Sequence, residues 1–367
     1  MKILCFHPAL APYRVDFFNL LADKVELKIL FLQDNLFSQK FDQAALKRKL
    51  KCSYGSLTRG FDIRNRCIRF GVLQAVRAIS PDVVLAYEAS PVTLALIMFR
   101  KFHLMKANIW TFMDDSPDQV RSRTGLRRII RDWVVNNTNR ILVPSAQAAA
   151  AYPYSKLPCS SLPNSSTFPL SRFSVVPIIH DTEAIRVNAD KVFEMGREWR
   201  RTNVPHGWNK VLLFVGRFAA IKNIPWLIDR MSELPVDVGL VLVGDGGEKD
   251  VLKERVASVG LASRVLFAGR KEGDELYAMM SMADGLVLCS HSEPFGAVVA
   301  EALQWGAPCV VSDNCGAAVL IENGVNGWVF PYGDRKAFIK VIDNLPRKTG
   351  ESLLAESLKD AVSSLFK

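Results

Sequence analysis

Two glutamates eight positions apart are the side chains of this sequence best placed to hold a polar ligand. Glu293 stands directly before Pro294, and Glu301 follows within the same apolar stretch. Proline is favoured at the first helical position, so Pro294 predicts that a helix begins there. A rise of ~1.5 Å per residue then separates the two carboxylates by roughly 12 Å along the helix axis. Since a helix N-terminus attracts anions, this spacing fits an extended nucleotide-sugar with its diphosphate near the helix start.

A structural role for these two acids is the alternative. From Ala297 to Trp305 nearly every residue except Glu301 and Gln304 is apolar, which predicts a helix buried on most sides. An unpaired carboxylate is costly to bury. Glu301 therefore requires either a buried cation or a hydroxyl group of a ligand.

Two cations follow a predicted strand at Val211 to Val215. Arg217 can fork across two phosphate oxygens, and Lys222, five residues later, supplies a point charge. Gly216 lets the backbone pass close beneath a phosphate. The chain has no D-x-D pair, so we expect no metal-bridged diphosphate, and these two cations would replace the metal.

Two further predicted strands of the same half end in candidate ligand-binding residues. Val238 to Val243 is followed by Gly244 in a glycine-rich turn, which could equally be an ordinary tight connection. Val265 to Ala268 is followed by Gly269 and Arg270, which could meet a nucleotide base.

The amino-terminal half offers its own candidates at the ends of predicted strands. Asp114 and Asp115 follow the strand Ala107 to Phe112 and could act as a base near an acceptor hydroxyl or as caps of the next helix. Tyr13 and Arg14 follow the first strand and are candidates for the acceptor side, with ordinary helix-start packing as the alternative.

Short apolar strands alternate with helices along the whole chain, which predicts an α/β protein with two doubly wound sheets facing across a ligand cleft. The length of 367 residues fits two domains. We place an acceptor-binding domain at 1–178, a linker helix at 179–208 and a donor-binding domain at 209–349, with a last helix at about 350–367 that could pack back on the first domain. Lys47 to Arg69 and Pro153 to Pro177 are predicted to be irregular.

Charge is distributed unevenly. Residues 1–180 hold 25 basic and 12 acidic residues, a net of +13, which leaves 47−25=22 basic and 37−12=25 acidic residues, a net of −3. No zinc-finger spacing or RNA-binding signature favours nucleic acid, so the basic half predicts an anionic membrane surface. Two basic stretches with interleaved apolar residues are the candidate contacts, Lys47 to Arg69 and Arg121 to Asn136. The first could equally be a solvated loop, and the second is the better candidate for a membrane surface or for binding phosphate.

Seven scattered cysteines without a C-x-x-C pair predict a reducing compartment. No signal peptide and no membrane-spanning stretch are predicted, because the most apolar window, Val83 to Phe99, contains Glu88 and Pro91. We therefore expect a cytoplasmic protein, peripheral at the inner face of the cell membrane.

The second half contains, in this order, Gly216-Arg217 with Lys222, Val243-Gly244-Asp245-Gly246, Phe267-Ala268-Gly269-Arg270, Ala283-Asp284, Glu293-Pro294-Phe295-Gly296 with Glu301-Ala302, Gly306-Ala307-Pro308 and Asn326-Gly327. The order and spacing of these motifs resemble the retaining family 4 glycosyltransferases of the GT-B fold. Ala11-Pro12-Tyr13-Arg14 and Pro81-Asp82-Val83-Val84 resemble the bacterial surface-polysaccharide members more loosely.

The resemblance implies sugar transfer with retention from a UDP- or GDP-sugar, a substrate rather than a cofactor, to a lipid-linked saccharide. It implies that Arg217 and Lys222 hold the donor diphosphate, Glu293 the sugar hydroxyls and Glu301 the ribose. It also implies backbone donors at Phe295 and Gly296.

The chain departs from the family pattern at several positions. Met113-Asp114-Asp115 stands where a histidine is common, and Ala318-Val319 replaces the expected Pro-Glu. These departures leave a non-catalytic nucleotide-sugar-binding subunit as an alternative function. A nucleotide-sugar epimerase on the same fold is a second alternative.

Overall fold

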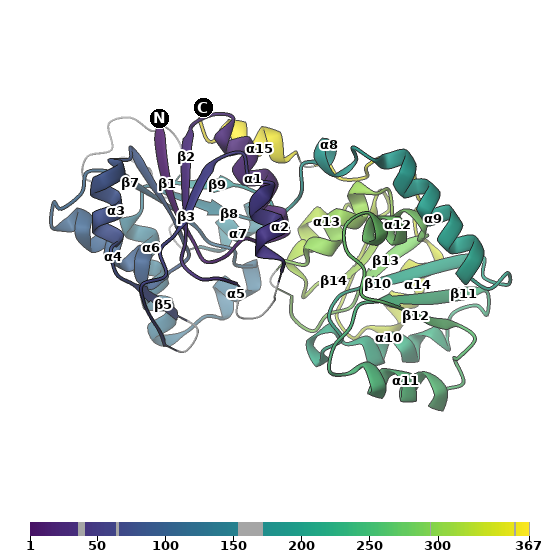
Figure 1. Cartoon of the computed structure of the whole chain (residues 1–367). Helices are drawn as coiled ribbons and strands as arrows, with labels where there is room; N and C mark the ends of the chain where they lie inside the picture. Colours follow the sequence, from purple (N-terminus) through teal and green to yellow (C-terminus); the bar gives the residue numbers. More distant parts are fainter. Residues whose placement is uncertain (36–40, 64–65, 153–171, 294, 356, 367) are drawn as a thin grey trace. The chain divides into compact units, whose positions relative to one another are not determined.

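The computed structural model describes residues 1–35, 41–63, 66–152, 172–293, 295–355 and 357–366. The chain forms two compact units (Figure 1). The first unit is Met1–Asp181 together with Leu358–Lys367, and the second is Thr182–Ser357.

A parallel sheet of seven strands forms the centre of the first unit's described residues. Its order is β3-β2-β1-β6-β7-β8-β9. The strands are β1 (Lys2–His7), β2 (Glu26–Phe31), β3 (Ser53–Ser56), β6 (Val83–Tyr87), β7 (Asn108–Phe112), β8 (Arg140–Val143) and β9 (Phe173–Val175). Short runs of buried apolar residues explain why most of these segments form strands covered on both faces.

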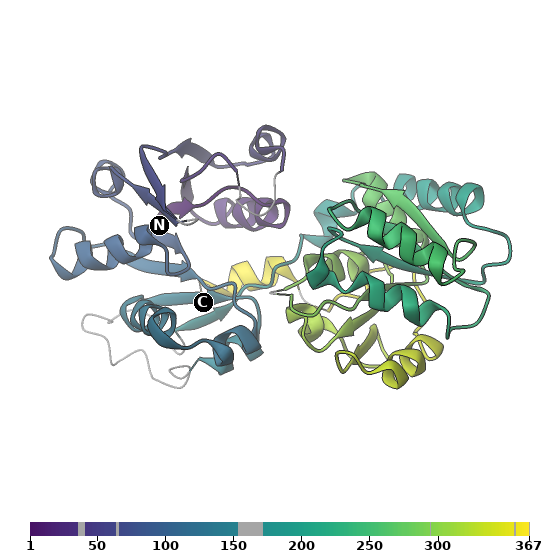
Figure 2. The same cartoon turned by 90° about the horizontal axis from the view of Figure 1, so that it is seen from below.

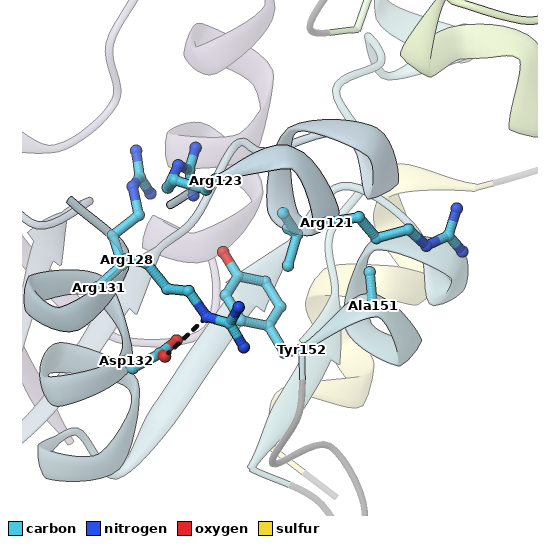
Figure 3. A pocket seen from close by; sticks show the side chains of 8 residues that line it. Arg121, Arg123, Arg128, Arg131, Asp132, Ala151 and Tyr152 are labelled. Carbon is cyan, nitrogen blue, oxygen red and sulfur yellow. Dashed lines mark ion pairs between the residues drawn. The ribbon is translucent and has the colours of Figure 1, made fainter. Parts of the chain in front are cut away.

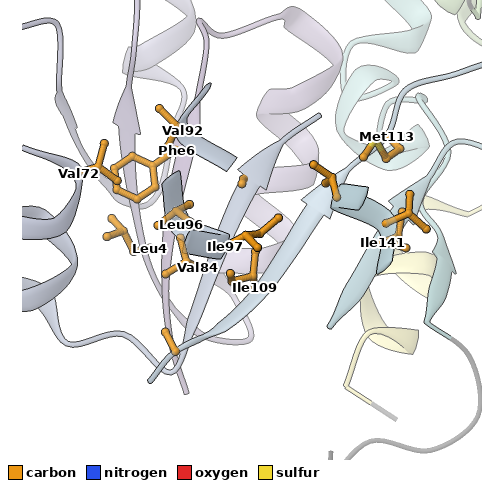
Figure 4. Close-up of a cluster of buried hydrophobic side chains, with 14 of the residues drawn as sticks. Leu4, Phe6, Val72, Val84, Val92, Leu96, Ile97, Ile109, Met113 and Ile141 are labelled. Atoms are coloured by element: carbon orange, nitrogen blue, oxygen red, sulfur yellow. The ribbon is translucent and has the colours of Figure 1, made fainter. Parts of the chain in front are cut away.

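Helices cover this sheet. They are α1 (Pro12–Ala22), α2 (Gln43–Arg48), α3 (Val72–Ile79), α4 (Pro91–Lys101), α5 (Pro117–Ser122), α6 (Gly125–Asn137), α7 (Ala146–Ala151) and α15 (Leu358–Ser364). Alternate strand residues such as Leu4 and Phe6 pack against Val72 of α3 and Leu96 of α4 in one apolar core (Figure 4). Since side chains alternate across a strand, Ile3 and Cys5 are buried toward the other face.

The second unit has a six-stranded parallel sheet of order β12-β11-β10-β13-β14-β15. Its strands are β10 (Lys210–Val215), β11 (Val238–Val243), β12 (Val265–Gly269), β13 (Gly285–Leu288), β14 (Cys309–Ser312) and β15 (Gly327–Phe330). Its helices are α8 (Thr182–Ile185), α9 (Ala189–Asn203), α10 (Ile224–Met231), α11 (Lys249–Ser258), α12 (Asp274–Met282), α13 (Ala297–Gln304) and α14 (Arg335–Asp343), with the 3₁₀ turns η2 (Ala220–Lys222) and η3 (Gly316–Leu320). Figures 1 and 2 show helices along both faces of this sheet.

The strand order reverses direction once in each sheet, at β1/β6 in the first unit and at β10/β13 in the second. The prediction of two doubly wound α/β sheets is therefore confirmed. Ligands of such sheets bind outside the carboxyl ends of the strands at this reversal.

The basic stretch Lys47 to Arg69 was predicted to be irregular, and that prediction is wrong. It contains β3 at the sheet edge and a separate antiparallel hairpin of β4 (Gly60–Ile63) and β5 (Arg66–Arg69). The residues of β4 are all exposed, so the sequence has no buried apolar pattern there that would predict the hairpin.

Other boundaries also differ from the predictions. Arg121 to Asn136 is divided between α5 and α6, and β9 lies within Pro153 to Pro177, of which 153–171 fall outside the described residues. The supposed linker helix at 179–208 is not a linker, because α9 belongs to the second unit and packs along α12. The segment α15 belongs to the first unit.

Within the part of the chain that the structure describes, no helix has both the length and the apolar character needed to cross a bilayer.

A glycine allows α9 to approach α12 closely. A Cβ on Gly196 would lie 2.4 Å from Ser281 Oγ and 2.7 Å from the Ala278 carbonyl oxygen. We predict that Gly196→Ala lowers the free energy of unfolding by about 1 to 2 kcal/mol, because overpacking outweighs the ~1 kcal/mol gain in helix propensity. Urea unfolding checks this, with Gly207→Ala as the control because its Cβ would meet nothing within 4 Å. A stabilised Gly196→Ala variant would contradict the close packing.

Candidate functional site

Lys222 and Glu293 meet at the strand-order reversal of the second unit. Lys222 ends η2, in the connection after β10, and Glu293 lies in the connection after the neighbouring strand β13. Their side chains form an ion pair, and each is only about one-sixth exposed, at 17% and 16%. The ammonium can bind a phosphate and the carboxylate can accept hydrogen bonds from hydroxyl groups.

Backbone hydrogen bonds tie the two connections together. The His291 N–H donates to the Ile221 carbonyl at 2.8 Å, and the Cys289 thiol lies 3.5 Å from the Asn223 carbonyl oxygen. The position of Lys222 relative to Glu293 is therefore set largely by the main chain.

A third connection, after β14, holds Glu293 from the other side. The Glu293 N–H donates to the Asn314 carbonyl at 3.2 Å, and the Gly316 N–H donates to the Glu293 carbonyl at 2.9 Å. Asn314 also donates from Nδ2 to the His291 carbonyl at 2.9 Å. Three neighbouring connections thus fix the main chain of Glu293, and Lys222 binds its carboxylate.

Helix α13 begins later than predicted. Pro294 lies outside the described residues, and the helix runs from Ala297 with Gly296 before it in the left-handed region at φ 91°. A Cβ on Gly296 would lie 2.9 Å from Leu288 Cδ2 and 3.2 Å from Glu293 Cγ. Glycine is thus required both by the backbone conformation and by the close approach to Glu293.

Glu301 is the fifth residue of α13, about one turn from its start rather than two. Its side chain is half-buried, while Ala300 and Ala302 on either side of it are fully buried. The axial separation predicted for the two glutamates does not hold, because Glu293, Phe295 and Gly296 are not helical.

The other candidates of the second unit lie at the ends of its strands. Arg217 is exposed in the connection after β10, and Arg270 is exposed after β12, where it pairs with Glu272. Gly244 adopts φ 145°, and a Cβ there would lie 1.9 Å from the Gly216 carbonyl oxygen. The connections after β10 and β11 therefore approach each other at a point where a side chain on residue 244 would not fit. Phe295 is buried beside Gly296.

In the first unit, Arg14 and Asp114 pair with each other. The Arg14 guanidinium donates to both Asp114 carboxylate oxygens, at 2.6 and 2.7 Å, and lies 4.2 Å from the Phe112 ring centroid. The Tyr87 hydroxyl donates to the same carboxylate at 3.1 Å. Arg14 is 2% exposed, so it supports the fold here and does not point toward solvent as an acceptor contact. Tyr13 beside it is half-buried.

Asp115 is buried among three donors. Arg123 binds its two oxygens at 2.5 and 2.9 Å, Arg131 binds it at 2.8 Å, and the Tyr152 hydroxyl donates to it at 2.7 Å. Burial alone would raise the pKa of Asp115, but these hydrogen bonds and charges outweigh it and hold that pKa below its ordinary value. Neither Asp114 nor Asp115 caps the following helix, because Ser116 does so with Gln119 in a capping box.

The sequence analysis did not select His7 or Glu88, which end β1 and follow β6 at the first unit's reversal point. Burial and the charge of Arg14 lower the pKa of His7 to about 3, so its ring is neutral. Glu88 adopts φ 49°, uncommon for this residue type, and pairs with Arg131 at 2.7 Å. Burial raises the pKa of Glu88, and the charge of Arg131 offsets this only in part. The sequence feature that could have identified His7 and Glu88 as candidates is their position at the ends of predicted strands.

Residues 196–357 match the family model described as "Glycosyl transferases group 1". This span covers less than half of the chain but contains every candidate residue of the second unit. The match therefore lies entirely within the second unit.

Relatives and solved structures extend the likeness. The lipopolysaccharide core biosynthesis glycosyltransferase LpsE of Rhizobium meliloti is 29% identical over 166 residues, which are 42% of this chain and 48% of LpsE. The chain spans from 32% to 48% of the length of the first three curated relatives it matches.

Two solved structures cover nearly the whole chain. Anabaena HepE in complex with UDP has a TM-score of 0.67 at 19% identity, covering 94% of this chain and 89% of HepE. The lipopolysaccharide outer core galactosyltransferase WaaB in its apo form has a TM-score of 0.67 at 18% identity, covering 99% of this chain and 94% of WaaB. These likenesses establish the GT-B fold with two Rossmann-like domains.

The buried Asp115 cluster predicts a pH-dependent loss of stability. Because the folded pKa of Asp115 is lowered, its contribution is present above the ordinary carboxyl pKa of about 4 and is lost as the pH falls toward the folded value. We predict that Asp115→Asn costs about 3 kcal/mol near neutral pH and that its difference from wild type narrows below about pH 4. Thermal unfolding across this pH range checks it, with the exposed Asp34→Asn as the control. A difference independent of pH would contradict the ionised cluster.

Proposed function

We propose that the protein is a retaining glycosyltransferase that moves a sugar from a UDP- or GDP-sugar to a lipid-linked saccharide in cell-surface polysaccharide synthesis. The observation that carries the proposal is the Lys222 and Glu293 ion pair at the reversal point of the second unit's sheet, inside the matched domain. In a doubly wound sheet this is where a nucleotide binds.

The ion pair suggests how a donor is recognised. An ammonium and a carboxylate that neutralise each other are stable while half-buried, whereas removing either leaves an uncompensated charge. A nucleotide-sugar offers a partner to each, with its diphosphate on Lys222 and its sugar hydroxyls on Glu293. Binding of the donor therefore replaces the ion pair between Lys222 and Glu293 with one contact from each residue to the ligand.

The remaining donor contacts follow the resemblance in motifs. Arg217 is exposed at the same strand end and takes the second side of the diphosphate. Glu301 accepts hydrogen bonds from the ribose, the N–H groups of Phe295 and Gly296 lie near the sugar and phosphate, and Arg270 lies at the base. In this proposal Arg217 and Lys222 neutralise the diphosphate without a metal.

The catalytic base is assigned to the donor itself. Asp114 is paired with Arg14, and Asp115 is surrounded by Arg123, Arg131 and Tyr152. The lowered pKa of Asp115 makes it a poor proton acceptor, and both oxygens of Asp114 already accept hydrogen bonds from Arg14. We therefore propose that the leaving phosphate takes the proton of the acceptor hydroxyl, and that Glu293 orients the sugar.

The acceptor and the location are inferred from the first unit and from the relatives. LpsE and WaaB are named for lipopolysaccharide synthesis. Residues 1–180 carry a net charge of +13, counted above, and Leu126 and Ile129 of α6 are 70% and 65% exposed. A basic surface with exposed apolar residues suits the anionic inner face of a cell membrane.

The donor site predicts a specific loss of transfer. Lys222→Ala should lower the turnover rate about 100-fold or more, because one preorganised charge on the leaving diphosphate is removed. Release of nucleotide from a panel of UDP- and GDP-sugars, with a cell-envelope lipid extract as acceptor, measures this. Lys253→Ala, an exposed lysine of α11, is the matched control and should leave the rate unchanged.

Ligand-induced stabilisation provides the second measurement. A bound nucleotide-sugar should raise the unfolding temperature of the wild type and of Lys253→Ala but not of Lys222→Ala or Glu293→Gln. Full transfer in both site variants would refute the site. Conversion of the donor without any acceptor would favour an epimerase, and binding without turnover would favour a non-catalytic subunit.

A further inference from the structure

A cavity lined by arginines lies in the first unit. It has a volume of about 240 Å³ and is formed by residues of α5, of α6, of the link between them and of the end of α7. Its lining consists of Val120, Arg121, Arg123, Arg128, Arg131, Asp132, Ala151 and Tyr152 (Figure 3). We call it the arginine pocket.

The buried Asp115 carboxylate holds one wall of the arginine pocket. It binds Arg123, Arg131 and Tyr152 together, and Arg131 also pairs with Glu88. The guanidinium groups on this wall are therefore positioned before any ligand arrives. Preorganised donors lose little conformational entropy when a ligand binds.

The arginine pocket has more positive than negative charge. Its lining holds four arginines against Asp132, and with Asp115 and Glu88 the acids number three, an excess of 4−3=+1. Arg128 is weakly held, since its Nε lies 3.6 Å from Asp132 and its side chain is 57% exposed. Its guanidinium can turn toward an incoming anion.

We propose that the arginine pocket binds a phosphate group. A guanidinium donates two parallel hydrogen bonds to phosphate oxygens, and several of them around one cavity are typical of phosphate recognition. The volume is several times that of a water molecule, which occupies about 30 Å³ in the liquid, so a phosphate group and its nearest substituent fit. Neighbouring arginines that repel one another gain from an anion placed among them.

Two sources could supply this phosphate. A soluble phosphate compound would need only the pocket, whereas a lipid headgroup would also need an apolar contact nearby. Leu126 and Ile129 on the exposed part of α6 can supply that contact. The pocket belongs to the first unit and Lys222 to the second, so the proposal does not depend on glycosyl transfer.

The test measures phosphate binding by the intact chain and its variants at constant ionic strength. The soluble probes are inorganic phosphate and pyrophosphate, followed by calorimetry. The lipid probe is phosphatidylcholine vesicles with and without phosphatidylglycerol, followed by co-sedimentation. The variants are Arg128→Gln and Arg121→Gln, with Arg127→Gln as the matched control because it lies exposed on α6 outside the pocket lining.

We expect Arg128→Gln and Arg121→Gln each to weaken binding about tenfold, the effect of one charge-assisted hydrogen bond. Arg127→Gln should have no such effect. Lys222→Gln should also leave phosphate binding by the arginine pocket unchanged. This result distinguishes the pocket from a phosphate site in the second unit. Loss with the soluble probes indicates a general phosphate site, and loss with phosphatidylglycerol vesicles alone indicates a lipid headgroup. Equal loss in Arg127→Gln and Arg128→Gln, or no binding to any probe, would overturn the proposal.

Discussion

The reversal of strand order in a parallel sheet is the constraint on which the rest of this molecule depends. At β10 and β13 the chain continues to opposite sides of the sheet, so the two connections cannot pack as a continuous layer. Lys222 and Glu293 come from these two connections and pair above the reversal. Backbone hydrogen bonds between the connections hold both side chains, so the site is positioned by the sheet itself.

The same constraint has a different electrostatic result in the first unit. There the reversal at β1 and β6 is occupied by Arg14 and Asp114, with the neutral ring of His7 and other aromatic rings packed around them. Buried charges are tolerated only when paired, and here the pairing is complete within the protein. The pair stabilises the unit and leaves the Asp114 carboxylate already bound by Arg14. This is the physical reason for assigning proton transfer to the donor phosphate.

The sequence predicted the parts of the structure that depend on local signals. Apolar runs place β11 at the predicted residues and β10 and β12 within one residue of them, and the charged residues that follow β10 and β13 mark the site. The hairpin of β4 and β5 was missed because the residues of β4 are all exposed and its pairing is set by contacts outside the local pattern. The start of α13 was predicted too early, because the prediction used Pro294 and did not consider Gly296. Gly296 adopts the left-handed conformation, and the helix begins after it.

The partners of Asp115 show a more general limit of sequence reasoning. Arg123, Arg131 and Tyr152 lie 8, 16 and 37 residues away, and no spacing rule connects them before the helices are packed. The sequence showed an excess of positive charge in the first half and the basic stretch Arg121 to Asn136. Packing pairs Arg123 and Arg131 with the buried Asp115 and places Arg121 and Arg128 in the lining of the same cavity. Burying Asp115 therefore has two effects: it requires arginines close by for its own stability, and by orienting them it forms one wall of the arginine pocket.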